Sequence, residues 1–178
     1  PASSLLDQWI LARLNEVTKE MTRKLDQYDI VDAARTLEAF MSNDLSRWYI
    51  RRSRERFKKE DEDAKMTAEV LRIVLQETAT LLAPFAPFMA EAVYQEVGGG
   101  KKSVHLEEWP SSQSFQLSAR LPVGQAFSFQ LLKEMNEVRA IVAQALDLRA
   151  KAGIKIRQPL ASLKIKMQKS KIKNKEFL

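Results

Sequence analysis

Apolar residues recur every three or four positions over most of this sequence, and this spacing constrains the fold more than any other feature. In residues 4–25 the spacing places one apolar stripe along a helix, formed by Leu6, Ile10, Leu14, Val17, Met21 and Leu25. Ser4 and Asp7 stand at the start of that run with the spacing of a capping box, which marks a helix N-terminus. The pattern therefore predicts a first helix over residues 4–25.

Four further helices are predicted from the same spacing and from the residues that interrupt it. The second follows a short connection at residues 27–29 and continues into a basic segment. The third ends before Pro84, because proline disfavours helical geometry in the residue that precedes it. The fourth begins at Pro87 and ends at the glycines of residues 98–100, and the fifth covers residues 126–151. Since the 178 residues include only 5 Gly and 6 Pro, an all-α bundle of about five helices is expected.

Three segments are predicted to lie outside these helices. Residues 58–65 indicate an exposed connection, and residues 104–106 a short extended piece. Residues 163–167 alternate in polarity like a strand, and a single strand needs partners to be stable. We therefore expect a helical domain over residues 1–160, with residues 161–178 belonging to the start of a following C-terminal region.

The composition excludes several classes of function. The sequence has no Cys and only one His, so it contains no disulfide and no Cys- or His-based metal cluster, and a structural role for His105 is favoured over catalysis. It also contains no Gly-rich phosphate loop and no nucleophile with an identifiable base, so we expect no catalytic residue, cofactor or metal within it. No apolar run is long enough to span a membrane, and the start at Pro1 shows no signal peptide, which favours a cytoplasmic fragment of a longer, monomeric protein.

Positive charge is concentrated in two regions of the sequence. Residues 47–59 hold seven basic residues and one acidic residue, and residues 149–175 hold ten basic residues and no acidic one. The rest of the chain is net acidic, although the whole carries a formal charge of +6. This distribution predicts that a polyanionic partner binds the two basic regions.

The basic region at the end of the second predicted helix has a specific geometry. At 100° per residue, Arg51 and Arg52 continue the apolar stripe that passes through Leu37 and Trp48. Burying unpaired guanidinium groups is costly, so we expect this helix end to project past the core and to meet phosphate or a nucleobase. A solvated helix end is the alternative. Trp48 itself is predicted to be a core residue rather than a surface for base stacking.

The second basic region combines cations from a helix end and from the residues that follow it. Gly153 allows the backbone to turn there, so that Arg149, Lys151, Lys155 and Arg157 would converge on one nucleotide. A charged hinge to the next domain is the alternative. Further along, residues 166–170 (KMQKS) imitate a loop that binds ATP phosphates, but we predict no such site without a nucleotide-binding fold.

Four blocks of the sequence resemble, in the same order, those of the isoleucyl-tRNA synthetases. They are residues 43–57 (NDLSRWYIRRSRERF), 82–91 (LAPFAPFMAE), 103–110 (SVHLEEWP) and 152–160 (AGIKIRQPL). The last two favour the isoleucine enzyme over its valine and leucine relatives. The sequence departs from the family pattern at Lys58 and in the acidic residues 60–63.

The resemblance implies the helical anticodon-binding domain of a class I aminoacyl-tRNA synthetase. Such a domain binds the anticodon arm of tRNA(Ile) and positions it for aminoacylation in a catalytic domain outside this chain. That catalytic domain uses ATP, and any zinc also lies outside these residues. The residues expected to bind tRNA are Arg47, Arg51, Arg52, Arg54, Arg56, Lys155 and Arg157. A valyl or leucyl enzyme, a helical protein-interaction module around Phe85, Phe88 and Trp109, and a general nucleic-acid-binding bundle remain the alternatives.

Overall fold

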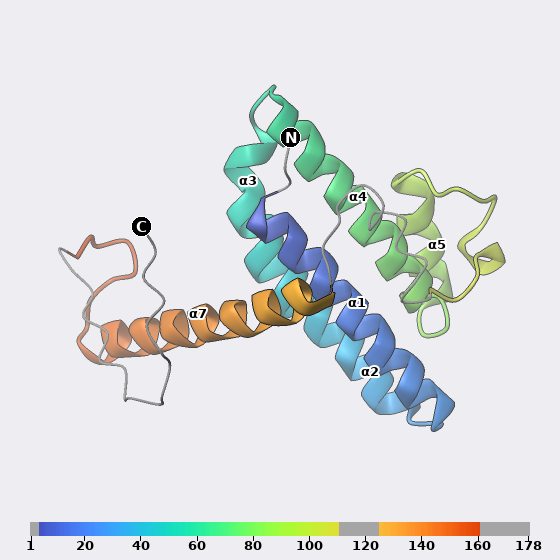
Figure 1. The fold of residues 1–178 in the computed structure, drawn as a ribbon, viewed down its shortest axis with the longest axis horizontal. Coiled ribbons are helices and arrows are strands. Elements are labelled where there is room, and N and C mark those ends of the chain that lie inside the picture. Colours follow the sequence, from blue (N-terminus) through green and yellow to red (C-terminus); the bar gives the residue numbers. More distant parts are fainter. Residues whose placement is uncertain (1–3, 111–124, 161–178) are drawn as a thin grey trace. The chain divides into compact units, whose positions relative to one another are not determined.

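The first helix begins where the capping residues predict. The computed structural model describes residues 4–110 and 125–160, and α1 spans Leu5–Asp26 (Figure 1). The Ser4 hydroxyl accepts the Asp7 N–H at 3.2 Å, and the Asp7 carboxylate accepts the Ser4 N–H at 3.3 Å. The reciprocal capping box is confirmed. Tyr28 then adopts a left-handed conformation, with a φ of 59°, which turns the chain into the second helix.

The second helical rod is continuous but not uniform. It consists of α2 (Ile30–Ala39), a π-helical segment η1 (Phe40–Ile50) and α3 (Arg51–Phe57). The Arg51 N–H donates to the carbonyl of Ser46, five residues earlier, which is the hydrogen-bond pattern of a π-helix. Because a π-helical turn is wider than an α-helical one, residues beyond η1 are rotated relative to an uninterrupted α-helix.

The third rod begins earlier than the sequence predicts. Helix α4 spans Glu62–Leu82, and the Asp61 carboxylate caps it by accepting the Ala64 N–H at 2.8 Å. Residues 62–65, which we expected in an exposed connection, are therefore the first turn of a helix. Helix α5 (Pro87–Glu96) follows with Pro87 in its first turn, as predicted, and Gly98 beyond its end has a φ of 71°.

The prediction of an extended piece at residues 104–106 is wrong. This segment is a single 3₁₀ turn, η2 (Val104–Leu106). The Glu91 carboxylate accepts both the Ser103 hydroxyl and the Val104 N–H at 2.9 Å, which fixes the start of the turn against α5.

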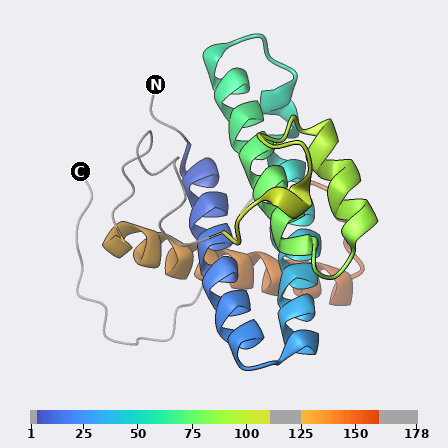
Figure 2. The same cartoon turned by 90° about the vertical axis from the view of Figure 1, so that its right-hand side faces the viewer.

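One hydrophobic core joins α1, the second rod and α4, which lie side by side (Figures 1 and 2). The last long helix, α7 (Gln125–Lys151), contributes Leu131 to this core, and Leu132 and Met135 pack against it. The largest fully buried side chains are Trp9, Tyr49, Tyr94, Phe40, Ile10, Leu14, Met21 and Leu37. The described ranges thus form an all-α structure with five helical rods, as predicted.

The chain divides into two compact units, Pro1–Glu137 and Val138–Leu178. The first contains α1 to α5 and the beginning of α7, and the second contains the rest of α7 and the residues after it. The predicted strand at residues 163–167 and the phosphate-loop imitation at residues 166–170 lie outside the described residues. The predicted domain boundary near residue 160 stays a prediction.

Candidate nucleic-acid interface

Four of the predicted tRNA-binding residues are exposed on the second rod. Arg47, Arg51, Arg52 and Arg54, here called the cationic ridge, are all exposed. In the ranges that the structure describes, no carboxylate lies within ion-pair distance of Arg47, Arg51 or Arg54. Several uncompensated guanidinium groups on neighbouring turns are the arrangement that a phosphate backbone binds.

The reason for this exposure differs from the predicted one. The core side passes through Tyr49 rather than through Trp48, because the buried residues of η1 and α3 are Phe40, Asp44, Leu45, Tyr49 and Ser53. Arg51 and Arg52 therefore do not continue the core stripe, and that expectation is corrected. The π-helical turns rotate both arginines to the outside of the rod.

Arg56 is separated from the ridge by its partners. Its side chain is only 16 % exposed, and its guanidinium binds the fully buried Asp7 through two hydrogen bonds, of 3.0 Å and 2.7 Å. It also binds Asp63 at the start of α4, at 2.7 Å and 2.8 Å. Hydrogen bonds that Arg56 donates to Asp63 and then to Asp7 raise the pKa of Arg56 above its ordinary value, and the contact with Arg56 lowers the pKa of Asp63. The geometry gives Arg56 a structural role and argues against the tRNA contact that we expected of it.

Tyr49 completes this junction of three helices. Its hydroxyl donates to the Asp7 carboxylate at 2.8 Å, and burial, with the nearby Asp7 charge, raises the pKa of Tyr49 well above its ordinary value. The sequence indicated neither Tyr49 nor Asp7 as a partner of the basic region. The two hydrogen bonds between Arg56 and Asp7 join residues 49 positions apart, and no local spacing identifies such a pair.

Trp48 and Arg52 form a stacked pair within the ridge. The guanidinium carbon of Arg52 lies 3.5 Å from the centroid of the Trp48 ring. Trp48 is half-buried, and its side chain also packs against the hydrophobic core. The predicted core role therefore holds for one side of the indole, while Arg52 covers another.

The remaining predicted residues belong to the second unit. Gly153 has a φ of 68° and allows the chain to turn after α7, as predicted. The Arg149 guanidinium donates to the carbonyls of Lys155, Ile156 and Gln158, at 2.5, 3.1 and 2.6 Å, and so shapes this turn. Lys155 and Arg157 are exposed.

The other members of that basic region have local partners. Lys151 pairs with Asp147, one helical turn earlier, at 2.7 Å. Because Arg149 and Lys151 are both engaged, the four cations that we expected to converge are reduced to Lys155 and Arg157.

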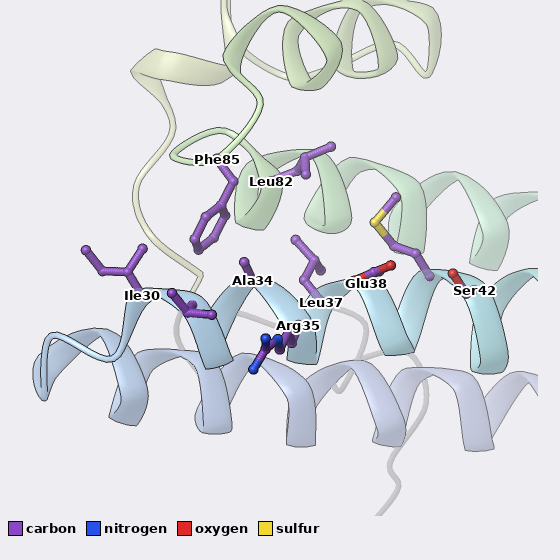
Figure 3. A pocket seen from close by; sticks show the side chains of 10 residues that line it. Ile30, Ala34, Arg35, Leu37, Glu38, Ser42, Leu82 and Phe85 are labelled. Atoms are coloured by element: carbon purple, nitrogen blue, oxygen red, sulfur yellow. The ribbon is translucent and has the colours of Figure 1, made fainter.

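An apolar groove of about 600 Å³ lies between α2 and the end of α4 (Figure 3). Ile30, Ala34, Leu82 and Phe85 line it, and its one basic residue, Arg35, is bound to Asp32 at 3.2 Å. Such a surface does not suit a polyanion. Phe85 thus lines a groove as the protein-interaction alternative requires, whereas the Trp109 Nε1–H instead donates to the Thr22 hydroxyl at 2.9 Å.

Other kinds of site are not found in the described residues. No group of three acidic or His side chains could hold a metal ion there, and no helix among them is long and apolar enough to cross a membrane. His105 is exposed on η2.

These features define a helical bundle with an exposed cationic ridge, and comparison with known families gives the class of protein. Residues 7–166 match the family described as the anticodon-binding domain of tRNA ligase. The chain belongs to this family.

The curated relatives are similar over most of this chain. They include the isoleucine–tRNA ligases of Deinococcus radiodurans (36 % identical over 162 residues, 90 % of this chain and 14 % of the relative), Streptomyces coelicolor (39 % over 162 residues, 88 % and 14 %) and Thermus thermophilus (36 % over 165 residues, 89 % and 15 %). The expected resemblance to the isoleucine enzymes is confirmed. The chain spans about one seventh of the length of these relatives.

Proposed function

We propose that this chain is the part of an isoleucine–tRNA ligase that binds the anticodon arm of tRNA(Ile). The cationic ridge supports this proposal most directly, because four exposed arginines on adjoining turns offer planar donors along the length of one rod. The negatively charged phosphate backbone of RNA can bind such a row of donors.

In the proposed complex, Arg47, Arg51, Arg52 and Arg54 contact the RNA from the first unit, and Lys155 and Arg157 from the second. Arg56 is left out because its guanidinium is bound to Asp7 and Asp63. Phosphate contacts supply affinity and register, whereas discrimination between tRNAs requires contacts to bases.

The chemistry of the proposed ligase lies outside this chain. There, isoleucine is activated with ATP and joined to the end of the tRNA, while this domain holds the anticodon arm. The chain itself supplies no catalytic residue, cofactor or metal in this proposal. Its partners are the tRNA and the remaining domains of the same polypeptide, which we expect to act as a cytoplasmic monomer.

A footprint combined with a titration tests the proposal on the full-length polypeptide that carries this chain. Arg51→Ala with Arg54→Ala should weaken tRNA(Ile) binding, reduce its salt dependence and remove protection from the anticodon arm. Arg35→Ala is the matched control, because Arg35 is 72 % exposed and is bound to Asp32, outside the ridge. Unchanged affinity and footprint in the double variant, with the fold intact, would exclude the ridge as the binding surface.

A further inference from the structure

The contact between Arg52 and Trp48 differs in kind from a guanidinium that extends into solvent. A separation of 3.5 Å between the guanidinium carbon and the ring centroid is van der Waals contact. The guanidinium plane must therefore lie nearly flat on the indole, because an edge-on approach at this separation would force a nitrogen into the ring. The planar, charged group of Arg52 therefore lies over the face of the Trp48 ring and parallel to it.

Two features hold this pair in place. Trp48 is anchored because it is half-buried and packs against the core cluster. Arg52 stands four residues later, one turn along the helical rod, and its Nη1–H also donates to the Arg47 carbonyl at 3.4 Å. The planar group is therefore arranged before any ligand binds, which reduces the entropy lost on binding.

We propose that the Arg52–Trp48 pair stacks against an unpaired nucleobase of the bound RNA, whereas Arg47, Arg51 and Arg54 contact phosphates. Proteins that bind unpaired RNA commonly stack bases on aromatic rings or on guanidinium planes. In this arrangement the base, the Arg52 guanidinium and the Trp48 indole form three layers. The inference rests on the proposed function and adds a single-stranded contact to it.

The neighbouring arginines do not have this arrangement. Among the described residues no aromatic ring lies against Arg51 or Arg54, and both side chains are exposed on α3. They are suited to phosphate as charged, flexible donors. Arg51 is adjacent to Arg52 in the sequence and so provides a matched control for charge at this position.

The test uses the full-length polypeptide and two RNA probes. One is a hairpin with the anticodon stem and loop of tRNA(Ile), and the other is a fully paired duplex with the same stem sequence. Arg52→Lys keeps the charge and removes the plane. We expect it to weaken hairpin binding by roughly 5- to 150-fold, the effect of losing one stacked base, and to change duplex binding little. Arg51→Lys should change neither greatly.

Substitution of Trp48 tests the second layer. Trp48→Phe retains an aromatic support for the guanidinium and should keep most of the hairpin affinity, whereas Trp48→Leu should lose about as much as Arg52→Lys. Unfolding curves establish that each variant is folded. Arg52 is exposed, so Arg52→Lys remains an informative variant even if Trp48→Leu does not fold.

The outcomes separate this inference from the proposed function. If Arg52→Lys binds both probes like the parent, or weakens both equally, Arg52 makes only a charge or phosphate contact and the stacking proposal is overturned. Equal losses from folded Trp48→Phe and Trp48→Leu would also overturn it. If instead neither probe responds to Arg51→Ala with Arg54→Ala, the proposed function itself fails.

Discussion

Arg56 and Asp7 form a buried ion pair that joins the end of the second helical rod to the start of the first. The nitrogen and oxygen atoms are 2.7 Å apart, and the Asp7 side chain has no exposed surface. Because Asp7 also belongs to the capping box of α1 and accepts the Tyr49 hydroxyl, one carboxylate fixes three parts of the fold.

Loss of the Arg56 side chain should strongly destabilise the fold. Arg56→Ala leaves the Asp7 charge buried without its partner, and we expect the free energy of unfolding to fall by about 3–5 kcal/mol. Urea denaturation measures this change. Arg54→Ala, on the exposed side of the same helix, should alter it by less than about 0.5 kcal/mol. A loss below about 1 kcal/mol for Arg56→Ala would mean that this pair contributes little.

Trp48 and Trp9 should differ in their contribution to stability. Trp9 is fully buried in α1, so Trp9→Ala should cost about 3–5 kcal/mol. Trp48 is half-buried, and we expect Trp48→Ala to cost about 1–3 kcal/mol, less than the full cost of a central core aromatic. The two unfolding free energies, measured under the same conditions, compare the sites directly. Equal losses of unfolding free energy would mean that Trp48 contributes as much to stability as a fully buried core residue.

The salt dependence of tRNA binding should reveal which arginines contact phosphate. Each phosphate contact contributes about 0.7–0.9 to the slope of log affinity against log salt concentration. We expect Arg51→Ala and Arg54→Ala each to lower the magnitude of the slope by about this amount. Arg35→Ala should leave the slope unchanged, because Arg35 is bound to Asp32 away from the ridge. A slope unaffected by all ridge substitutions would contradict the proposed phosphate contacts.

Two glutamates should respond to pH in opposite directions. Burial, and to a lesser extent the charge of Glu107, raises the pKa of Glu77 above its ordinary value. Glu77 therefore favours the folded state most when it is protonated, and this contribution is lost as the pH rises through its folded pKa. We expect Glu77→Gln to raise the melting temperature at neutral pH, with the gain shrinking as the pH falls towards about 4.3, the ordinary glutamate pKa.

Glu91 provides the comparison. Hydrogen bonds from Gln95, from the Val104 N–H and from Ser103 lower the pKa of Glu91. Its contribution is present above the ordinary pKa and is lost as the pH falls through the folded pKa. Glu91→Gln should therefore lower the melting temperature at neutral pH, and the difference should disappear in acid. Melting curves that move in the same direction for both variants would contradict these assignments.

Local sequence signals predicted much of the fold. Ser4 and Asp7 located the start of α1, Pro87 the start of α5, and Gly153 the turn after α7. In each case the stabilising contact or backbone conformation involves residues within a few positions, so spacing and residue type are sufficient.

The errors have distant causes. The π-helical segment was not expected, and its buried Asp44 is bound by Arg13 of α1 at 2.8 Å, 31 positions away. The turn at Val104 is held by Glu91, 13 positions earlier. Four of the seven expected tRNA-binding residues are exposed on the second rod, and the contacts with Asp7 and Asp63 distinguish Arg56 from them.

The π-helical segment makes the position of the cationic ridge depend on the number of residues before it as well as on their identity. Deleting one residue from η1 would change the direction of every later side chain around the axis of the rod, because an α-helix rotates by about 100° per residue and a π-helical turn is wider. Arg51 and Arg52 would then face in other directions, and Arg56 would lose its alignment with Asp7. A shortening that preserves every charge would thus be more damaging than many substitutions, and insertions or deletions within residues 40–50 should be poorly tolerated.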